Sequence, residues 1–271
     1  MKCCIGEYVH GYSEREAVRL TDQATTLATL LHHDTSYPPG SLVLEAGSGV
    51  GAQTGTLAAQ SRGARIVSFD ISALSLSAAR SRLGETATVS TDFVQGDLFR
   101  LPFPPAAFDH VFVCFVLEHL ADPLGALASL REVIRPGGSI TVIEGDHGSA
   151  IFSPRSREAD ESIRCLVDLQ AELGGNALIG RELYPLLNRS GFDRVAVSPR
   201  LVYSDGSRPH LADGFVRRTF TAMVEGVGDQ AVRRGLMRSA DWEKGVGDLY
   251  RTAEPDGVFC YLFFKATGIK P

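Results

Sequence analysis

The chain has 271 residues, 44% of them hydrophobic and 22% charged, which is typical of a folded globular protein and not of a disordered one. Asp and Glu outnumber Lys and Arg by 32 to 27, so the net charge is −5. Phosphate binding needs a basic surplus, and this balance therefore argues against a general nucleic-acid or anionic-membrane binder. Five cysteines without metal-like spacing, and the lack of a signal peptide or a long apolar run, indicate a soluble, cytoplasmic chain without a metal site.

The first half of the chain alternates between helical and extended patterns. Residues 13–16 form a capping box, and apolar residues at helical spacing predict a helix to about His33, inside an N-terminal helical arm at 1–36. Further on, helices with cap and stop residues separate short apolar runs that we interpret as strands. Such alternation is typical of a mostly parallel sheet covered by helices on both faces. The runs are 42–44, 66–69, 89–94, 111–116 and 140–143.

The pattern changes after Gly145. Helical patterns cover most of the remaining chain, beginning with a helix that Ser153 caps, and two late strands interrupt them. The predicted segments are 153–173, 181–189, 195–197, 208–253 and 259–264. We therefore expect residues 37–271 to form one α/β domain whose helical cover lies at about 148–190 and 205–254.

The most informative motif, Glu45-x-Gly47-x-Gly49-x-Gly51, directly follows the first predicted strand. Glycines are needed where the backbone turns tightly and approaches a ligand with no Cβ in the way. The next segment starts a helix whose N-terminal amides face the loop. Asp70, roughly 20 residues further on at the end of the second strand, can accept both hydroxyls of a ribose. The sequence therefore predicts a nucleoside-binding crevice at the carboxyl edge of the sheet.

Two classes of ligand fit this crevice. Gly47-x-Gly49-x-x-Ala52 also matches the relaxed fingerprint of dinucleotide binding, so an NAD-dependent oxidoreductase is an alternative. Glu45, however, puts negative charge where a dinucleotide would bring its pyrophosphate, and the ammonium and sulfonium of S-adenosylmethionine are the better electrostatic match. Asp97, after the third strand, adds a carboxylate that can bind an adenine amino group. Both acidic residues favour S-adenosylmethionine.

Further short motifs follow the later strands. With the glycine loop, they resemble the motifs of the class I S-adenosylmethionine-dependent methyltransferases, in particular the branch similar to ubiquinone and menaquinone biosynthesis enzymes. The segments that carry the resemblance are Glu45-x-Gly47-x-Gly49-x-Gly51, Asp70, Gly96-Asp97-Leu98, Phe108-Asp109, Leu117-Glu118-His119-Leu120 and Arg135-Pro136-Gly137-Gly138. The resemblance implies a Rossmann-like α/β fold with a seven-stranded, mostly parallel sheet of order 3-2-1-4-5-7-6. Its last strand would be antiparallel, and helical insertions would follow strands 5 and 6.

The resemblance also implies which residues would hold S-adenosylmethionine and its product S-adenosylhomocysteine. The glycine loop would line the methionine end, Asp70 would bind the ribose, and residues after the second and third strands would meet the adenine. The expected cofactor contacts are Tyr12, Glu45, Gly47, Ser48, Gly49, Gln53, Asp70, Ile71, Gly96, Asp97, Leu98 and Phe115.

Catalytic candidates are few, because methyl transfer from a sulfonium chiefly requires alignment of the nucleophile. His147 follows the fifth strand at the sheet edge where ligands bind, and it is a candidate acid or base; the alternative is a loop histidine bonded to backbone. Tyr8 and Tyr12 precede the arm helix and are candidates to close over the substrate or cofactor, or else to anchor the arm. We interpret Glu118 and His119 as structural or cofactor-edge residues.

Apolar side chains at helical spacing in the late insert have two interpretations. Core packing is the simpler one, and part of the set lining an apolar acceptor pocket is the other. The residues are Phe215, Phe220, Met223, Trp242 and Tyr250.

Residues 11–16, 31–34 and 143–148 also resemble a narrower microbial subgroup of natural-product methyltransferases. That resemblance implies C-methylation of a prenylated indole alkaloid, followed by cyclisation. We therefore expect methyl transfer from S-adenosylmethionine to a small apolar acceptor, without a nucleic-acid or membrane partner, in a homo-oligomer formed through the arm. The alternatives are an NAD-dependent oxidoreductase and a non-catalytic protein that binds S-adenosylmethionine.

Overall fold

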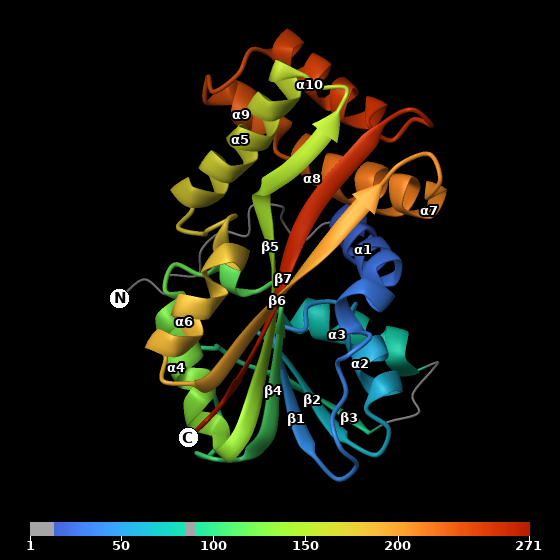
Figure 1. The fold of residues 1–271 in the computed structure, drawn as a ribbon. Helices are drawn as coiled ribbons and strands as arrows, with labels where there is room; N and C mark the ends of the chain where they lie inside the picture. Colours follow the sequence, from blue (N-terminus) through green and yellow to red (C-terminus); the bar gives the residue numbers. More distant parts are fainter. Residues whose placement is uncertain (1–13, 85–89) are drawn as a thin grey trace.

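A seven-stranded sheet forms the centre of the computed structural model, which describes residues 14–84 and 90–271 (Figure 1). The strand order is β3-β2-β1-β4-β5-β7-β6, with β7 antiparallel to both of its neighbours. Both findings confirm the order and the antiparallel last strand that the sequence resemblance implied. The strands are β1 Leu42–Ala46, β2 Arg65–Asp70, β3 Thr91–Gln95, β4 Phe108–Cys114, β5 Ile134–Ser153, β6 Asp193–Ser204 and β7 Val258–Ile269.

Helices cover both faces of the sheet and build a separate lobe above it (Figure 1). The helices of the sheet layers are α1 Glu14–His32, α2 Thr54–Gln60, α3 Ala73–Gly84, α4 Pro123–Val133 and α6 Leu183–Arg189, with short 3-10 turns η1 Leu117–His119 and η2 Ile179–Glu182. The lobe contains α5 Arg157–Glu172, α7 Pro209–Leu211, the π-helix η3 Ala212–Thr221, α8 Ala222–Glu225, α9 Gly228–Arg233 and α10 Ser239–Arg251. The helical insertions after β5 and β6 are thereby confirmed.

The central strands are buried on both faces, as expected for apolar runs in a parallel sheet. One hydrophobic cluster joins α1 and α2 to the sheet through residues such as Leu27 and Leu57, and continues into the upper lobe. A second cluster packs α4 and α6 against the opposite face through residues such as Leu127 and Leu186. Side chains cap the starts of α3 and α4: Ser72 accepts the backbone N–H of Ser75, and Asp122 accepts that of Gly125 ahead of Pro123 at the first helical turn.

Strand β5 is much longer than the predicted run 140–143 and continues to Ser153. Beyond the parallel sheet it pairs with β7, down to the pair Ser153 and Val258, with a register shift between Asp146 and Ile151. The predicted helix start at Ser153 is therefore wrong, because that residue is still in the strand; Ser156 caps α5 instead by accepting the N–H of Ala159. The extended β5, β6 and β7 carry the upper lobe (Figure 1).

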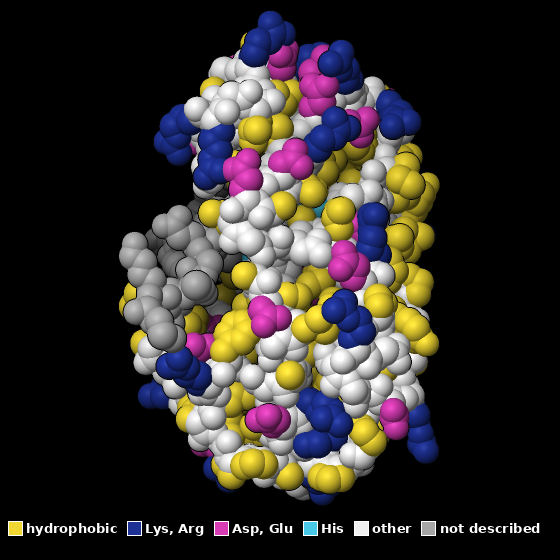
Figure 2. All heavy atoms as spheres, turned by 90° about the vertical axis from the view of Figure 1, so that its left-hand side faces the viewer, with side chains coloured by type: hydrophobic (Ala, Val, Ile, Leu, Met, Phe, Trp, Pro, Cys, Tyr) yellow, Lys and Arg dark blue, Asp and Glu magenta, His cyan; other side chains and the backbone are white. Residues whose placement is uncertain are grey.

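Basic and acidic side chains are interspersed on the face that Figure 2 presents, over the helical lobe in particular. The helices of the lobe carry several ion pairs, including Arg157 with Glu161 on α5 and Lys244 with Asp248 on α10. Within residues 14–84 and 90–271, no helix is both long and apolar enough to cross a membrane.

Candidate active site

The glycine-rich loop between β1 and α2 has the backbone that the motif predicted. Gly47, Gly49 and Gly51 all have positive φ, between 52° and 74°, a region that side chains with a Cβ rarely occupy. A Cβ at Gly47 would overlap the Val116 side chain, whereas one at Gly49 would meet no atom within 4 Å. The loop is thus closely packed at its first glycine and open at its second, where a ligand can approach the backbone.

Asp70 closes this loop from the end of β2. Its Oδ2 accepts the backbone N–H of Gly49 at 2.8 Å, and its Oδ1 accepts that of Ser72 at the same distance. Each carboxylate oxygen has a second lone pair and can still accept a ribose hydroxyl. Burial raises the pKa of Asp70, while the backbone N–H groups act against the rise.

Glu45 lies at the end of β1 with its side chain fully buried. Its Oε2 accepts the hydroxyl hydrogen of Thr54 at 2.6 Å. Burial raises the pKa of Glu45 to about 8, against the effect of the Thr54 hydrogen bond, so this carboxyl is mostly protonated at pH 7. The negative charge assumed from the sequence therefore needs a neighbouring cation, such as a ligand ammonium or sulfonium, to bring this pKa down.

The loop fits the methionine and ribose parts of S-adenosylmethionine. The buried Ser48 hydroxyl has no hydrogen-bond partner among the described residues, so a ligand group can supply one. Open space above Gly49 and free lone pairs on Asp70 lie beside it. Gln53, in contrast, is already bonded through Oε1 to Nε2 of His32 at 2.8 Å, which holds α1 against this side of the loop.

The residues expected around the adenine follow β2 and β3. Ile71 is partly exposed, and Asp97 accepts the N–H of Phe99 through Oδ1, which shapes the turn after β3. A Cβ at Gly96 would overlap the Phe69 ring, so only glycine fits there. Leu98 is half-buried beside them. These residues border one edge of the sheet next to Asp70, as β2 and β3 are neighbours.

A small pocket of about 40 Å³ lies next to this loop. Phe115 reaches it with a positive φ of 59°, unusual for a residue other than glycine and typical of strained backbone at functional sites. The next residue, Val116, packs under Gly47. The pocket and the glycine loop therefore meet at the turn after β4. The pocket is lined by Arg19, Leu20, Gln23, Phe115, Glu118, His119, Gly145, His147, Phe215, Thr219, Phe220, Met223, Tyr261 and Phe263.

One wall of the pocket is aromatic and the other is polar. Phe215, Phe220 and Tyr261 are in ring contact with one another, with centroids 5.4 to 6.3 Å apart. Phe215, Phe220 and Met223 are thus the part of the predicted apolar set that lines a pocket, whereas Trp242 is buried elsewhere in the core.

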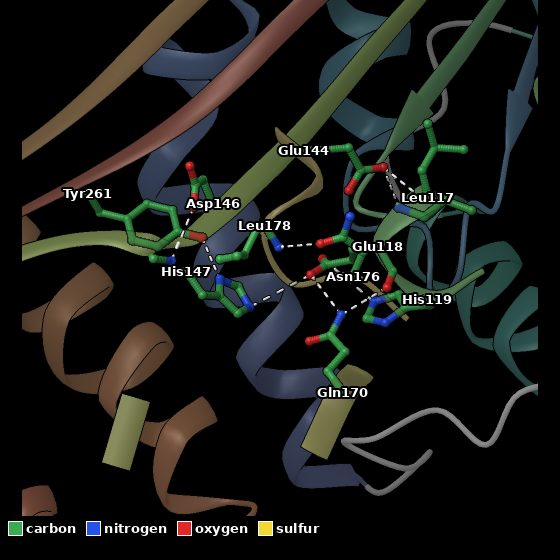
Figure 3. Close-up of polar contacts among 12 residues, drawn as sticks. Leu117, Glu118, His119, Glu144, Asp146, His147, Gln170, Asn176, Leu178 and Tyr261 are labelled. Carbon is green, nitrogen blue, oxygen red and sulfur yellow. Dashed lines mark hydrogen bonds and ion pairs between the residues drawn. The ribbon is translucent and has the colours of Figure 1, made fainter. Parts of the chain in front are cut away.

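His147 stands in the polar wall, and Figure 3 shows it between Tyr261 and Glu118. It lies within β5 and not in a loop, because β5 extends to Ser153. Its Nδ1 is 2.6 Å from the Tyr261 hydroxyl, and its Nε2 is 3.7 Å from Glu118 Oε2. Gln170 on α5 donates to the same Glu118 oxygen at 3.2 Å. These four polar side chains come from four different elements, β5, β7, η1 and α5.

The protonation of this group follows from its burial. Burial lowers the pKa of His147, so the imidazole is neutral at pH 7. Burial alone would raise the pKa of Glu118, but His119 and His147 in their protonated forms, the hydrogen bond from Gln170 and the Arg19 cation hold that pKa below its ordinary value. When the imidazoles are neutral, Gln170 and Arg19 still stabilise the Glu118 carboxylate, which faces His147 in the polar wall of the pocket.

Sequence reasoning found part of this site. Glu118, which the sequence indicated as a structural or cofactor-edge residue, lines the pocket. Tyr261 was missed, since it lies 114 residues from His147 in an ordinary apolar strand run. Tyr8 and Tyr12 lie outside the described residues. Among residues 14–84 and 90–271, no group of three or more His, Cys, Asp or Glu side chains has an arrangement that holds a metal.

Comparison with known proteins identifies the domain. Residues 44–142 match the family described as "Methyltransferase domain". The chain is 31% identical over 209 residues to a 37.1 kDa protein of transposon Tn4556 from Streptomyces fradiae, covering 76% of this chain and 59% of that protein. It is 30% identical over 140 residues to the ubiquinone/menaquinone biosynthesis C-methyltransferase of Vibrio vulnificus, covering 51% and 53%. The chain therefore spans little more than half the length of these relatives.

Solved structures of methyltransferases share this fold. Phosphoethanolamine N-methyltransferase 2 of Haemonchus contortus, in complex with phosphomonomethylethanolamine and S-adenosylhomocysteine, superposes with a TM-score of 0.57 at 15% identity, covering 92% of this chain and 52% of that one. The sheet order, the glycine loop and the domain match define a class I methyltransferase fold. Residues 44–142 thus form a methyltransferase domain, and the chain has the fold of the class I S-adenosylmethionine-dependent methyltransferases, whose cofactor is S-adenosylmethionine.

Proposed function

We propose that this protein transfers a methyl group from S-adenosylmethionine to a small apolar acceptor. The observation that carries the proposal is the junction at the turn after β4. Val116 packs against Gly47 of the cofactor loop there, and Phe115 lines the aromatic pocket. A donor site and an acceptor pocket thus share one short segment, as an in-line displacement requires.

The roles of the chain's residues follow from their positions. When bound, the cofactor supplies an activated methyl group on a sulfonium, which leaves a neutral thioether behind. The loop residues Gly47, Ser48 and Gly49, with the open space at Gly49, would hold its methionine end, and Asp70 its ribose hydroxyls. The aromatic wall excludes water and aligns the acceptor.

The catalytic assignment to His147 and Tyr8 is part of the same proposal. His147 is supported by its buried, neutral imidazole in the pocket wall, where it can exchange a proton with an acceptor. The assignments of Tyr8 and Tyr12 are based on their places in the sequence alone.

A finer proposal concerns the acceptor and its biological setting. The sequence segments 11–16, 31–34 and 143–148 resemble the C-methyltransferase of teleocidin biosynthesis. This resemblance favours a prenylated indole alkaloid as the acceptor and a role in secondary metabolism. In that case the nucleophile would be an alkene, and the cation formed on methylation would cyclise. The aromatic faces of Phe215, Phe220 and Tyr261 would suit such a cation. A cytoplasmic location and a homo-oligomer formed through the N-terminal arm complete this proposal.

Titration calorimetry tests the cofactor half of the proposal. S-adenosylhomocysteine is expected to bind with micromolar affinity, and NADH is expected to give no heat. NADH binding without S-adenosylhomocysteine binding would instead favour an oxidoreductase. Incubation of the protein with methyl-labelled cofactor and an extract of its producing cell then tests the transfer. Cofactor binding without transfer to any acceptor would indicate a non-catalytic binding protein.

A further inference from the structure

The Tyr261 hydroxyl is in hydrogen-bond contact with the His147 ring. Both side chains are buried, and the hydroxyl oxygen lies 2.6 Å from Nδ1 of the imidazole (Figure 3). A Cβ at position 145 would overlap this hydroxyl, so the pairing depends on Gly145. The tyrosine therefore holds one nitrogen of the ring, and a glycine on the neighbouring strand leaves the room for it.

The opposite nitrogen faces a carboxylate. Glu118 Oε2 lies 3.7 Å from Nε2 of His147, and Gln170 fixes the carboxylate by donating to it. A neutral imidazole carries one N–H, and a nearby negative charge favours that hydrogen on Nε2. Nδ1 then accepts a hydrogen bond, which the Tyr261 O–H can donate.

This arrangement leaves a donor and an acceptor side by side in the pocket. Nε2 of His147 is buried and has no hydrogen-bond partner among the described residues, because 3.7 Å to Glu118 is too long for a hydrogen bond. A ligand atom that accepts from Nε2–H and donates to Oε2 would satisfy both groups. A hydroxyl does this with a single atom, whereas an ether oxygen can only accept and an ammonium can only donate.

We propose that Tyr261 fixes His147 with its hydrogen on Nε2, so that His147 and Glu118 together hold a hydroxyl group of an otherwise apolar acceptor. Tyr261 is a positioning residue in this scheme. The aromatic side chains of the pocket receive the apolar body, and the flexible Met223 can move to make room for it. Such room is needed, as about 40 Å³ holds a few water molecules while benzene occupies a cavity of roughly 150 Å³. The inference rests on the proposed function for the presence of an acceptor.

Nitrogen-15 NMR of the histidine rings tests the positioning role without any acceptor. The His147 signals, assigned with a His147→Gln variant, are expected to show hydrogen on Nε2 in the native protein. Tyr261→Phe and Gly145→Ala are both expected to shift the Nδ1 signal toward that of an unbonded nitrogen. Tyr37→Phe is the matched control, since Tyr37 is also buried but stacks on His110 at the other end of β4. Hydrogen on Nδ1 in the native protein overturns the inference.

Binding of matched small probes tests the hydroxyl specificity. Phenol is expected to bind about 10-fold more tightly than anisole, which keeps the ring and the oxygen but lacks the donor. Glu118→Gln is expected to reduce this ratio several-fold, because it replaces a charged acceptor by a neutral one. Equal binding of the two probes, or no phenol binding at millimolar concentration, overturns the proposal.

The two proposals fail in different ways. Phenol and anisole are titrated with and without S-adenosylhomocysteine, whose own binding is measured separately. Absent S-adenosylhomocysteine binding with a preserved phenol preference refutes the proposed function and leaves the pocket assignment standing. Normal S-adenosylhomocysteine binding without a phenol preference refutes only the hydroxyl site.

Discussion

Two carboxyl groups, Glu45 and Asp70, end neighbouring parallel strands, and burial raises the pKa of both. Their surroundings nevertheless differ. Asp70 accepts two backbone N–H groups, while Glu45 has a single hydroxyl partner and complete burial. We therefore expect Asp70 to work as an ionised acceptor for ribose hydroxyls, and Glu45 to change its protonation when a cation arrives.

Asp70→Asn is expected to weaken S-adenosylhomocysteine binding by about 10- to 100-fold, because a hydrogen bond to a charged group contributes about 1.5–3 kcal/mol. Calorimetry at constant pH measures the change. Asp92→Asn is the matched control: this aspartate is on the adjacent strand β3 and pairs with Arg65 on the surface. An unchanged affinity in Asp70→Asn would mean that the ribose lies elsewhere.

Glu45→Gln is expected to remove a pH dependence of stability. A folded-state pKa of about 8 against 4.5 in the unfolded chain means that the folded protein holds this proton more tightly. The stabilisation is complete below pH 4.5 and is lost as the pH rises toward 8, by about 1.4 kcal/mol per pH unit at most.

The test compares urea unfolding of the native protein and Glu45→Gln between pH 5 and pH 8. Other groups also change the stability with pH. Burial lowers the pKa of His32 to about 4, so its contribution to stability rises with pH up to 6.5. Because His32 is present in both proteins, its contribution cancels in the difference, which isolates Glu45. A difference that is constant over this pH range would refute the assigned pKa.

The residues of the glycine loop could be predicted from the sequence because a local motif encodes them. Gly47, Gly49 and Gly51 need positive φ, and that need is visible in the composition of one short segment. Tyr261 and His147 could not be paired in this way, because their contact depends on the register of β5 against β7. Sequence reasoning assigned a negative charge to Glu45 from its residue type, and it therefore missed that burial keeps this carboxyl mostly protonated at pH 7.

At the scale of whole elements, the end of helix α1 is joined to β7 and β6, the last two strands in the order of the sheet. Asp34, just beyond the helix, accepts from Lys265 of β7 at 2.6 Å and also pairs with Arg200 of β6. Burial opposes its ionisation, but the hydrogen bonds from Lys265 and Arg200 lower the pKa of Asp34 to about 2. The helix that contributes Arg19 and Gln23 to the pocket is thus positioned by an ion-pair network.

Asp34→Asn is expected to loosen α1 while leaving the sheet intact. Hydrogen exchange of the α1 amides should become faster at pH 7, and the strand amides should be unaffected. The difference in α1 exchange rate between the variant and the native protein should shrink as the pH falls from 3.8 toward 2, because Asp34 loses its charge in the folded state over that range. Asp241→Asn, which breaks the exposed pair with Arg238 on α10, is the control. Unchanged exchange in α1 would show that other contacts position the helix.

The elements differ in how far the sequence predicts them. Strands β1, β2 and β4 lie close to their apolar runs, because burial on both faces demands continuous hydrophobic residues. The ends of β5 were missed because the outer half of that strand contains Gly145, Asp146 and Gly148 and is held by non-local pairing with β7. The strand order came from the family resemblance, since periodicity alone does not specify which strands are neighbours.

At the scale of the whole molecule, ligand binding and stability are linked. The glycine loop joins β1 to α2, and the pocket joins α1, the sheet and the upper lobe, so a ligand in this region would contact elements from α1 to β7. A ligand that binds only the folded state adds about 2.7 kcal/mol of stability at 100 times its Kd.

For a protein of this size that gain corresponds to a rise in Tm of about 5–10 °C. Differential scanning calorimetry with S-adenosylhomocysteine is expected to show this rise as one shift of the whole transition, because the two hydrophobic clusters share the sheet between them. Asp70→Asn at the same ligand concentration should show a smaller rise, and NADH none. If only part of the transition moved, the upper lobe would unfold separately from the cofactor site. The two hydrophobic clusters would then not act as one cooperative unit, and the expectation of a single shift would be wrong.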